Sequence, residues 1–392
     1  MMNEYELKLK QRYRTSFGHG QEIDLFAPGR VNLIGEHIDY NGGRVMPCSL
    51  SVGTYGAASR RRDGEIRLVS ADFSAPPVIV GADELALLAH EPSAFRDFGW
   101  AAYPLGVAAK LMARGVHIGG FELAVTGSLP RGSGLSSSAS LEVLTAAVLK
   151  KLFGFKLDGV AASKLSVEAE RDCAGVNCGI MDQFVCAMGK KAHALLLDTA
   201  TLEYEYLPFE LGDNTLLIMN TNKPRRLADS KYNERRAECE QAVKLLGSKP
   251  DLCAYSTEEF DALSGRLSET VRRRAKHAVY ENRRTLDAAE ALKAGDMEAL
   301  GRLLNESHDS LRYDYEVTGR ELDSIVSAAR AQEGVLGARM TGAGFGGCAI
   351  ALVKKAAAES VIKNVTDIYK KETGYDCGIF MAETEAAPFA EV

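Results

Sequence analysis

Short apolar runs and helix-like repeats alternate along the first half of the chain. Apolar and β-branched runs predict strands over Ile23–Ala27, Val45–Tyr55, Ile66–Ser70 and Phe121–Thr126. Apolar residues that recur every three or four positions predict helices over Trp100–Arg114, from Leu135 onward, over Val160–Cys173 and over Met181–Met188. Gly175 follows the third of these helices, and glycine commonly ends a helix.

The second half of the chain is richer in helix. Stripes at helical spacing predict two helices, along Ala275, Val279, Asn282, Leu286 and Ala289 and along Leu300, Leu304 and Leu311. The remaining patterns predict a helix over Ala356–Lys371 and strands over His193–Leu197, Leu216–Asn220, Ala338–Thr341, Cys348–Val353 and Cys377–Ala382. With 392 residues and about 150 residues per domain, we expect an α+β chain of two domains, residues 1–200 and 201–392.

Composition narrows the class of protein. An apolar content of 46% and a charged content of 26% are typical of a globular protein with an ample core. The net charge of −6 argues against a nucleic-acid partner. We expect no membrane association and a cytoplasmic location, because the chain has neither a signal-like N-terminus nor a long apolar run. The 8 cysteines lack paired C-x-x-C spacing and are expected to be reduced and largely buried.

The segment Gly29–Tyr40, GRVNLIGEHIDY, has the densest candidate chemistry. Pro28 and Gly29 are predicted to end the preceding strand, so that the following residues project into a cleft instead of pairing in a sheet. Directional donors and acceptors then cluster within a few positions, at Glu36, His37, Asp39 and Tyr40. A sugar needs such a set, because each buried hydroxyl left unpaired costs about 1–3 kcal/mol. A transition-metal site at His37 is the weaker interpretation, since no second histidine stands at helical spacing.

A glycine- and serine-rich segment precedes the helix that starts after Leu135. Gly132 and Gly134 would let the backbone approach a phosphate, and the free N–H groups of the helix would hold the anion. Ser136, Ser137 and Ser138 add hydroxyl donors, one of which can reach a magnesium ion. Neither the Walker pattern nor the protein-kinase signatures occur. An ordinary turn that caps a helix is the alternative, and the Gly29–Tyr40 segment upstream favours the phosphate loop.

A second glycine-rich segment, Gly342–Gly347, satisfies the dinucleotide pattern G-x-G-x-x-G. That fold requires a helix directly after the glycines. Here the apolar run CAIALV follows and predicts a strand. We therefore expect a tight hairpin loop with a structural role.

Asp182 stands in the first turn of the short helix Met181–Met188, where the helix dipole favours an ionised carboxylate. Its neighbours are apolar, and a buried carboxylate needs a partner. Arg30 in the Gly29–Tyr40 segment is the candidate partner.

Three segments resemble a known family. GRVNLIGEHIDY resembles the galactokinase signature, while PRGSGLSSSA at Pro130–Ala139 and GARMTGAGFGG at Gly337–Gly347 are similar to the wider superfamily that phosphorylates galactose, homoserine, mevalonate and phosphomevalonate. The resemblance extends from about Phe26 to Val353. It implies an N-terminal domain like domain 2 of ribosomal protein S5, a ferredoxin-like C-terminal domain and an active site between them.

The resemblance also implies residue roles. Asp182 would take the proton from the anomeric hydroxyl, and Arg30 would keep Asp182 ionised and offset charge on the phosphoryl group. The implied galactose contacts are Glu36, His37, Ile38, Asp39 and Tyr232, with Tyr40 shaping the wall. The implied ATP contacts are Ser70, Gly132, Ser133, Gly134, Leu135, Ser136, Ser137 and Ser138. Ser138 and Glu170 would hold Mg²⁺. For Tyr232, packing at a helix start is an equally good interpretation.

The expected activity is an ATP- and magnesium-dependent transfer of phosphate to C1 of α-D-galactose. We expect a monomer without a protein partner. Two alternatives remain open at this point. One is a catalytically silent sensor of sugar and ATP that binds a transcriptional partner, although Arg30, Ser138, Glu170 and Asp182 are all present. The other is a kinase for N-acetylgalactosamine or arabinose.

Overall fold

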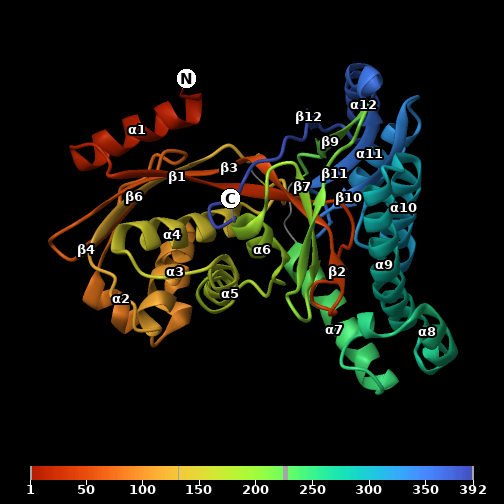
Figure 1. Cartoon of the computed structure of the whole chain (residues 1–392), viewed down its shortest axis with the longest axis horizontal. Coiled ribbons are helices and arrows are strands. Elements are labelled where there is room, and N and C mark those ends of the chain that lie inside the picture. The colour runs from red at the N-terminus through yellow and green to blue at the C-terminus, as the bar shows by residue number, and fades with distance from the viewer. Residues whose placement is uncertain (1, 131, 224–227, 391–392) are drawn as a thin grey trace.

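The computed structural model describes residues 2–130, 132–223 and 228–390. Its largest sheet has 5 strands in the order β1-β3-β6-β4-β5. The strands are β1 (Ile23–Asn32), β3 (Pro47–Arg60), β6 (Phe121–Gly127), β4 (Glu65–Ser70) and β5 (Val78–Gly81). The only parallel pair among these strands is β4 with β6. Helix α1 (Glu4–Phe17) covers one face of this sheet (Figure 1), where Leu9 and Tyr13 are buried.

Further helices cover the opposite face of this sheet (Figure 1). They are α2 (Ala82–Leu88), α3 (Ala102–Ala113), α4 (Ser137–Phe153), α5 (Gly159–Ala169) and α6 (Met181–Met188). Helix α4 lies against β1 and β3 and carries a nearly continuous set of buried apolar residues from Ala139 to Leu152. It therefore forms the centre of this core, and its N-terminus is fixed relative to β1.

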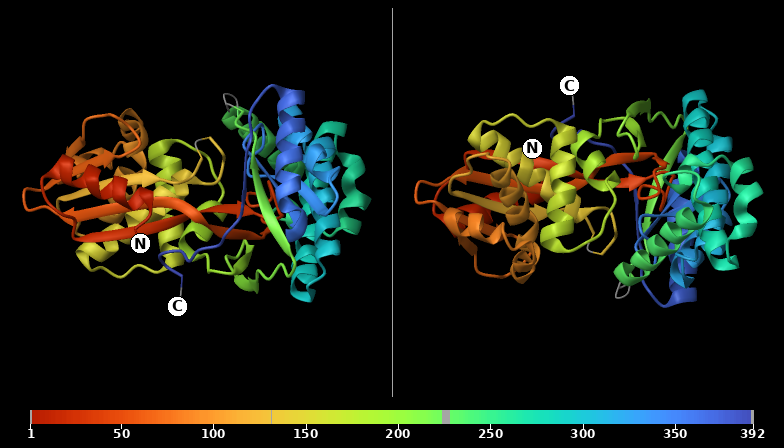
Figure 2. Two further views of the ribbon diagram at one scale, coloured as in Figure 1. Left: turned by 90° about the horizontal axis from the view of Figure 1, so that it is seen from above. Right: turned by 90° about the horizontal axis from the view of Figure 1, so that it is seen from below.

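The second half is built on an antiparallel sheet in the order β10-β11-β9-β12. Its strands are β9 (Asn214–Asn220), β10 (Val335–Thr341), β11 (Cys348–Lys354) and β12 (Gly378–Met381). The helices of this half are α7 (Ala228–Leu246), α8 (Thr257–Leu263), α9 (Glu269–Ala294), α10 (Met297–Ser310), α11 (Arg320–Arg330) and α12 (Ala358–Thr373). Figures 1 and 2 show most of these helices stacked on the outer side of the sheet, away from the N-terminal half.

Among the described residues, backbone segments as well as side-chain contacts join the N-terminal and C-terminal halves. A small sheet pairs β2 (Arg44–Val45) with β7 (His193–Asp198) and β8 (Tyr204–Pro208). The C-terminal segment after β12 returns to the N-terminal half (Figure 2), where the Phe389 amide donates to the Ala187 carbonyl at 3.1 Å. None of the helices within the described ranges is long and apolar enough to cross a membrane.

Strand β1 corrects one prediction. The strand does not end at Pro28 and Gly29: it continues to Asn32 and pairs with β3 on both sides of a register shift between Pro28 and Arg30. A proline has no N–H to donate, and a bulge is one of the places in a sheet that tolerates it. Glycine suits position 29, because a Cβ atom there would lie only 2.6 Å from the Leu135 carbonyl oxygen. The projecting loop therefore begins after Asn32.

Most other predicted elements are confirmed with small changes in their ends. Helix α6 has the predicted bounds, and the segment predicted as Val45–Tyr55 is divided into β2 and the longer β3. The predicted helix Val160–Cys173 is α5 followed by a π-helical turn at Glu170–Ala174, which ends at Gly175 with a left-handed φ of 78°. Helix α1 was not predicted.

Candidate active site

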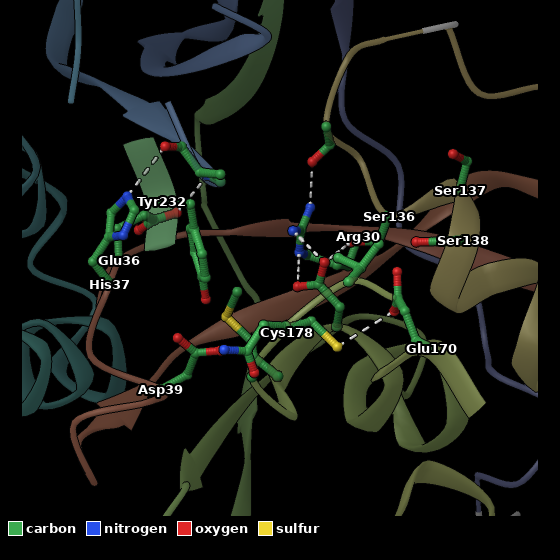
Figure 3. A pocket seen from close by; sticks show the side chains of 18 of the residues that line it. Arg30, Glu36, His37, Asp39, Ser136, Ser137, Ser138, Glu170, Cys178 and Tyr232 are labelled. Atoms are coloured by element: carbon green, nitrogen blue, oxygen red, sulfur yellow. Dashed lines mark hydrogen bonds and ion pairs between the residues drawn. The ribbon is translucent and has the colours of Figure 1, made fainter. Parts of the chain in front are cut away.

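A pocket of about 380 Å³ lies where the two halves meet. Its walls come from the Gly29–Tyr40 segment, the glycine–serine loop before α4, the turn between α5 and α6, the start of α7 and the loop after β10. Figure 3 shows His37, Asp39 and Tyr232 at one end, Ser137, Ser138 and Glu170 at the other, and Arg30 between them. The pocket thus has a polar end, which contains the His37 and Tyr232 rings, and a serine-rich end.

Arg30 and Asp182 form a bidentate pair in the middle of the pocket. The Arg30 Nε donates to Asp182 Oδ1 at 2.9 Å, and Nη2 donates to Oδ2 at 2.7 Å. The side chain of Arg30 is 5% exposed, whereas that of Asp182 is 30% exposed. Burial alone would lower the pKa of Arg30, but the Asp182 carboxylate outweighs it and the pKa lies above its ordinary value. The acidic member of the pair therefore faces the pocket.

Ser136 connects this pair to helix α4. It is the N-cap residue with a left-handed φ of 65°, and its side chain makes no capping hydrogen bond. Its hydroxyl instead donates to Asp182 Oδ2 at 2.6 Å. A non-glycine residue in this conformation is uncommon and often marks a functional position. The first N–H groups of α4 are left without a side-chain cap and suit an anion.

Glu36 lies at the other end and is 1% exposed. Three hydrogen-bond donors reach its carboxylate, Asn32 Nδ2 at 2.9 Å, Thr341 Oγ1 at 3.1 Å and the Gly342 N–H at 2.9 Å, and the Arg339 guanidinium forms an ion pair with it. Burial raises the pKa of Glu36, and Arg339 offsets part of that rise. Glu36 therefore ties the Gly29–Tyr40 segment to the glycine-rich loop after β10.

His37 is held as a neutral imidazole. Its ring nitrogens bond to the Tyr40 hydroxyl at 2.8 Å and to the Ala343 carbonyl at 3.2 Å, so Nε2 carries the proton. Burial, with the nearby His277 as a smaller cause, lowers the pKa of His37 to about 3. No group of three or more potential metal ligands surrounds it or any other part of the described chain. His37 thus forms a wall of the pocket and closes it against Ala343.

Asp39 is more exposed than Glu36, the other carboxylate at the polar end of the pocket. Burial and the negative charge of Asp182 raise the pKa of Asp39 to about 7. Gly179 lies directly against it, since a Cβ at that position would come within 1.7 Å of Asp39 Oδ2. The space for the Asp39 side chain therefore depends on a glycine in the turn between α5 and α6.

Tyr232 lies in the second turn of α7 and closes the polar end of the pocket. Its ring centroid is 5.6 Å from that of His37 and 5.2 Å from that of Tyr40. It also lines the pocket. Tyr232 therefore both packs near a helix start and faces the pocket, so the two interpretations made from the sequence do not exclude each other.

Ser138 and Glu170 form the serine-rich end. Burial, together with the charge of Asp182, raises the pKa of Glu170 to about 7, and the nearby Ser138 offsets part of that rise. A hydroxyl and a carboxylate are hard oxygen ligands of the kind that Mg²⁺ prefers, and Mg²⁺ usually keeps several waters and substrate phosphates. These two residues therefore fit a magnesium ion better than a metal with an all-protein shell.

Some predicted site residues lie away from the pocket surface. Ile38 is fully buried, and Leu135 is 1% exposed, although its carbonyl accepts from the Arg30 N–H at 3.2 Å. Ser70 is buried at the end of β4 and is not among the residues that line the pocket. Tyr40, predicted to shape the wall, is not among the lining residues either, whereas the other predicted residues, including Gly132, Ser133, Gly134 and Ser137, do line the pocket. Arg131, inside the second motif, lies outside the described residues.

Sequence reasoning missed several residues of the site. Cys178, Asn177 and Ala343 line the pocket, and Arg339 holds Glu36 from behind. Arg339 was visible as part of GARMTGAGFGG, but only the fold shows that β10 runs beside Glu36. Gln183 was visible in CGIMDQF, directly after Asp182.

Comparison with known proteins gives three family matches. The galactokinase galactose-binding signature matches residues 11–60, the N-terminal domain of GHMP kinases matches residues 102–190, and the C-terminal GHMP kinase domain matches residues 288–371. Fold and pocket thus define a two-domain GHMP kinase, a class of enzymes that use ATP.

Relatives with high identity narrow this class. Galactokinases of Ligilactobacillus salivarius and Clostridium tetani are each 48% identical over 381 residues, which is 96% of this chain and 97% and 95% of theirs. The crystal structure of Lactococcus lactis galactokinase complexed with galactose matches with a TM-score of 0.91 and 44% identity, and the match covers 97% of this chain and 98% of that one. The chain belongs to the galactokinase family. A mevalonate kinase from Methanococcus jannaschii, 20% identical with a TM-score of 0.66 and coverage of 94% and 99%, shares the fold.

Proposed function

We propose that the protein transfers the γ-phosphoryl group of ATP to the anomeric hydroxyl of α-D-galactose, giving galactose 1-phosphate and ADP. The observation that carries this proposal is the open Arg30–Asp182 pair. It stands between a polar end suited to a sugar and the uncapped N-terminus of α4. Galactokinases at 48% identity and the galactose complex of the Lactococcus enzyme support the choice of sugar.

Asp182 takes the proton from the C1 hydroxyl as the oxygen attacks the phosphorus. General-base catalysis of this kind is worth about 10²–10⁴-fold. Arg30 keeps the carboxylate ionised through two hydrogen bonds, and its positive charge also offsets charge on the transferring group. The hydrogen bond from Ser136 fixes the orientation of the second carboxylate oxygen.

The polar end positions the sugar. Asp39 and the Tyr232 hydroxyl accept and donate to galactose hydroxyls, and Glu36 and His37 complete the set. Ile38 supports them from the core. Positioning matters as much as the base, because orienting two reactants can supply about 7–11 kcal/mol and the transition state of phosphoryl transfer is loose.

The phosphates of ATP bind at Gly132–Ser138, where backbone N–H groups and the positive end of α4 attract them. Ser138 and Glu170 would hold Mg²⁺, which when bound offsets the negative charge of the phosphates. Leu135 contributes through its backbone. Ser70 remains a predicted nucleotide contact that lies outside the pocket lining.

The finer architecture is part of the same proposal. We assign residues 1–200 to a domain like domain 2 of ribosomal protein S5 and residues 201–392 to a ferredoxin-like domain, with the active site in the cleft between them. We also propose that the protein acts as a cytoplasmic monomer.

A coupled ADP-release assay across monosaccharides tests the function. With ATP and Mg²⁺ supplied, we expect the highest kcat/KM for galactose. Equal turnover of N-acetylgalactosamine would overturn the choice of sugar. Binding of galactose without any ADP release would favour the silent sensor instead.

A further inference from the structure

A buried polar chain lies behind the serine-rich end of the pocket, and the chemistry proposed above uses only its first member. It begins at Glu170, the first residue of the π-helical turn Glu170–Ala174. π-Helical turns inside helices are rare and are often found at functional sites.

Gln183 is the next member of the chain and is 0% exposed. Its Nε2 donates to Glu170 Oε2 and lies 3.2 Å from Glu142 Oε2. Gln183 directly follows Asp182 on α6. The same helix therefore presents the proposed base to the pocket and the amide to the back of Glu170.

Glu142 completes the chain and is also 0% exposed. It lies on α4, one turn after Ser138, which lines the pocket as Glu170 does. Residues four positions apart on a helix share a face. Groups on α4 therefore flank Glu170 from two sides, Ser138 within the pocket and Glu142 behind it through Gln183.

This cluster carries a cost for stability. Glu142 Oε1 and Gln183 Oε1 are buried and have no hydrogen-bond partner among the described residues. Each such group costs about 1–3 kcal/mol. Burial, with the charge of Glu170 as a smaller cause, raises the pKa of Glu142 well above its ordinary value, which favours a neutral hydrogen-bonding group. An apolar pair would fill this space at lower cost, so a role in the site explains the cluster better than packing does.

We propose that Gln183 and Glu142 are positioning residues that aim the Glu170 carboxylate at the divalent metal of the metal–ATP complex. The proposal rests on the proposed function. In metal sites generally, the groups that orient a ligating side chain are worth about 10–100-fold in metal affinity or activity when they are removed. Gln183 is the direct orienting group, and Glu142 fixes Gln183.

The test compares nucleotide binding with and without the metal. The affinity for a non-hydrolysable ATP analogue is measured by calorimetry in the presence and absence of Mg²⁺, for wild type, Gln183→Met and Glu142→Met. We expect both variants to lose about 10-fold of the Mg²⁺-dependent gain in affinity. The affinity for galactose and the metal-free affinity for the analogue should stay at the wild-type level. The Mg²⁺ concentration for half-maximal ADP release should rise in parallel.

Two further variants separate positioning from packing. Glu142→Gln keeps the shape and the hydrogen bond and should recover most of the loss seen in Glu142→Met. Thr145→Val is the matched control, because Thr145 is buried on the same helix and its hydroxyl donates to the Leu141 carbonyl of that helix at 2.8 Å. If Gln183→Met does not fold, Gln183→Asn, which withdraws the amide by one methylene, should show the same selective loss.

An unchanged Mg²⁺-dependent gain in the folded variants would overturn the proposal. So would a loss of galactose and metal affinity together with a lower melting temperature, because that pattern indicates packing alone. Failure of the proposed function is recognised separately, since wild type would then release no ADP with galactose.

Discussion

Two arginine–carboxylate pairs meet the Gly29–Tyr40 segment, and they differ in exposure. Arg30 and Asp182 have side chains that are 5% and 30% exposed, whereas Arg339 and Glu36 are 0% and 1% exposed. The first pair opens onto the middle of the pocket. The second is closed and is also bonded to Asn32, Thr341 and Gly342.

This difference in exposure separates a pair that can take part in the reaction from a pair that supports the structure around it. A carboxylate that is exposed to the pocket can exchange protons with a ligand. Both members of the buried pair have lost their hydration, and the pair mainly fixes the geometry around it. Glu36 lines the pocket, but its three hydrogen bonds and its ion pair with Arg339 leave little acceptor capacity for a ligand. We therefore expect its largest effect through the loop that it holds.

Arg339→Met breaks the closed pair and should have the largest effect. It leaves a buried carboxylate without its cation, which typically costs about 3–5 kcal/mol in the free energy of unfolding. Urea denaturation measures the change. The double variant Arg339→Met with Glu36→Gln should recover part of the loss, and wild-type stability in the single variant would show that the pair is not a support.

Arg30→Met breaks the open pair and should reduce catalysis more than stability. Loss of a preorganised electrostatic partner typically lowers kcat by about 10²–10³-fold. Steady-state kinetics at saturating galactose and ATP give the number. Arg60→Met is the matched control, because Arg60 pairs with Glu22 at the exposed surface. A kcat close to that of the control would remove Arg30 from the mechanism.

Gly179→Ala tests the contact with Asp39 at the polar end of the pocket. The new methyl group would overlap the Asp39 carboxylate, and Gly179 does not need a left-handed backbone, so the effect is steric. We expect the KM for galactose to rise about 10-fold, equivalent to about 1.4 kcal/mol, with the KM for ATP unchanged. Gly81→Ala should be silent, because the nearest atom to its Cβ is 3.8 Å away. Equal KM values in both variants would contradict the contact.

Asp39→Asn should have the smallest effect of these variants. It should change how the free energy of unfolding of the ligand-free protein depends on pH. The pKa of Asp39 lies at about 7 in the folded protein against an ordinary value of 3.8, so the native state binds more protons between these values. The stability of wild type should therefore fall relative to the variant as the pH rises through this window. Urea denaturation at about pH 5 and about pH 8 measures the difference. Curves that stay parallel would mean that the pKa of Asp39 is not raised.

Local signals were sufficient for part of this molecule. Helix α6 was predicted with its observed bounds, because its apolar spacing and the preceding glycines act locally. Helix α1 was missed although Asn3 and Glu6 form a capping box, because Leu9 and Tyr13 make only a narrow apolar stripe.

Long-range contacts account for the rest. The continuation of β1 past Pro28 depends on its pairing with β3 and on the Leu135 carbonyl, which accepts from Arg30. The Glu36–Arg339 pair joins distant parts of the chain, and no local pattern indicates it. The open pair was predicted because the family resemblance linked its two motifs, which the sequence alone only suggested through the apolar setting of Asp182.

Phosphoryl transfer to galactose by Asp182→Asn, followed in a single turnover, tests whether Asp182 is the catalytic base. The amide keeps the shape of the side chain but cannot accept the proton. We predict a rate about 10²–10⁴-fold below wild type, with the affinities for galactose and for an ATP analogue retained. A variant that transfers phosphate at the wild-type rate would contradict the assignment of Asp182 as the base.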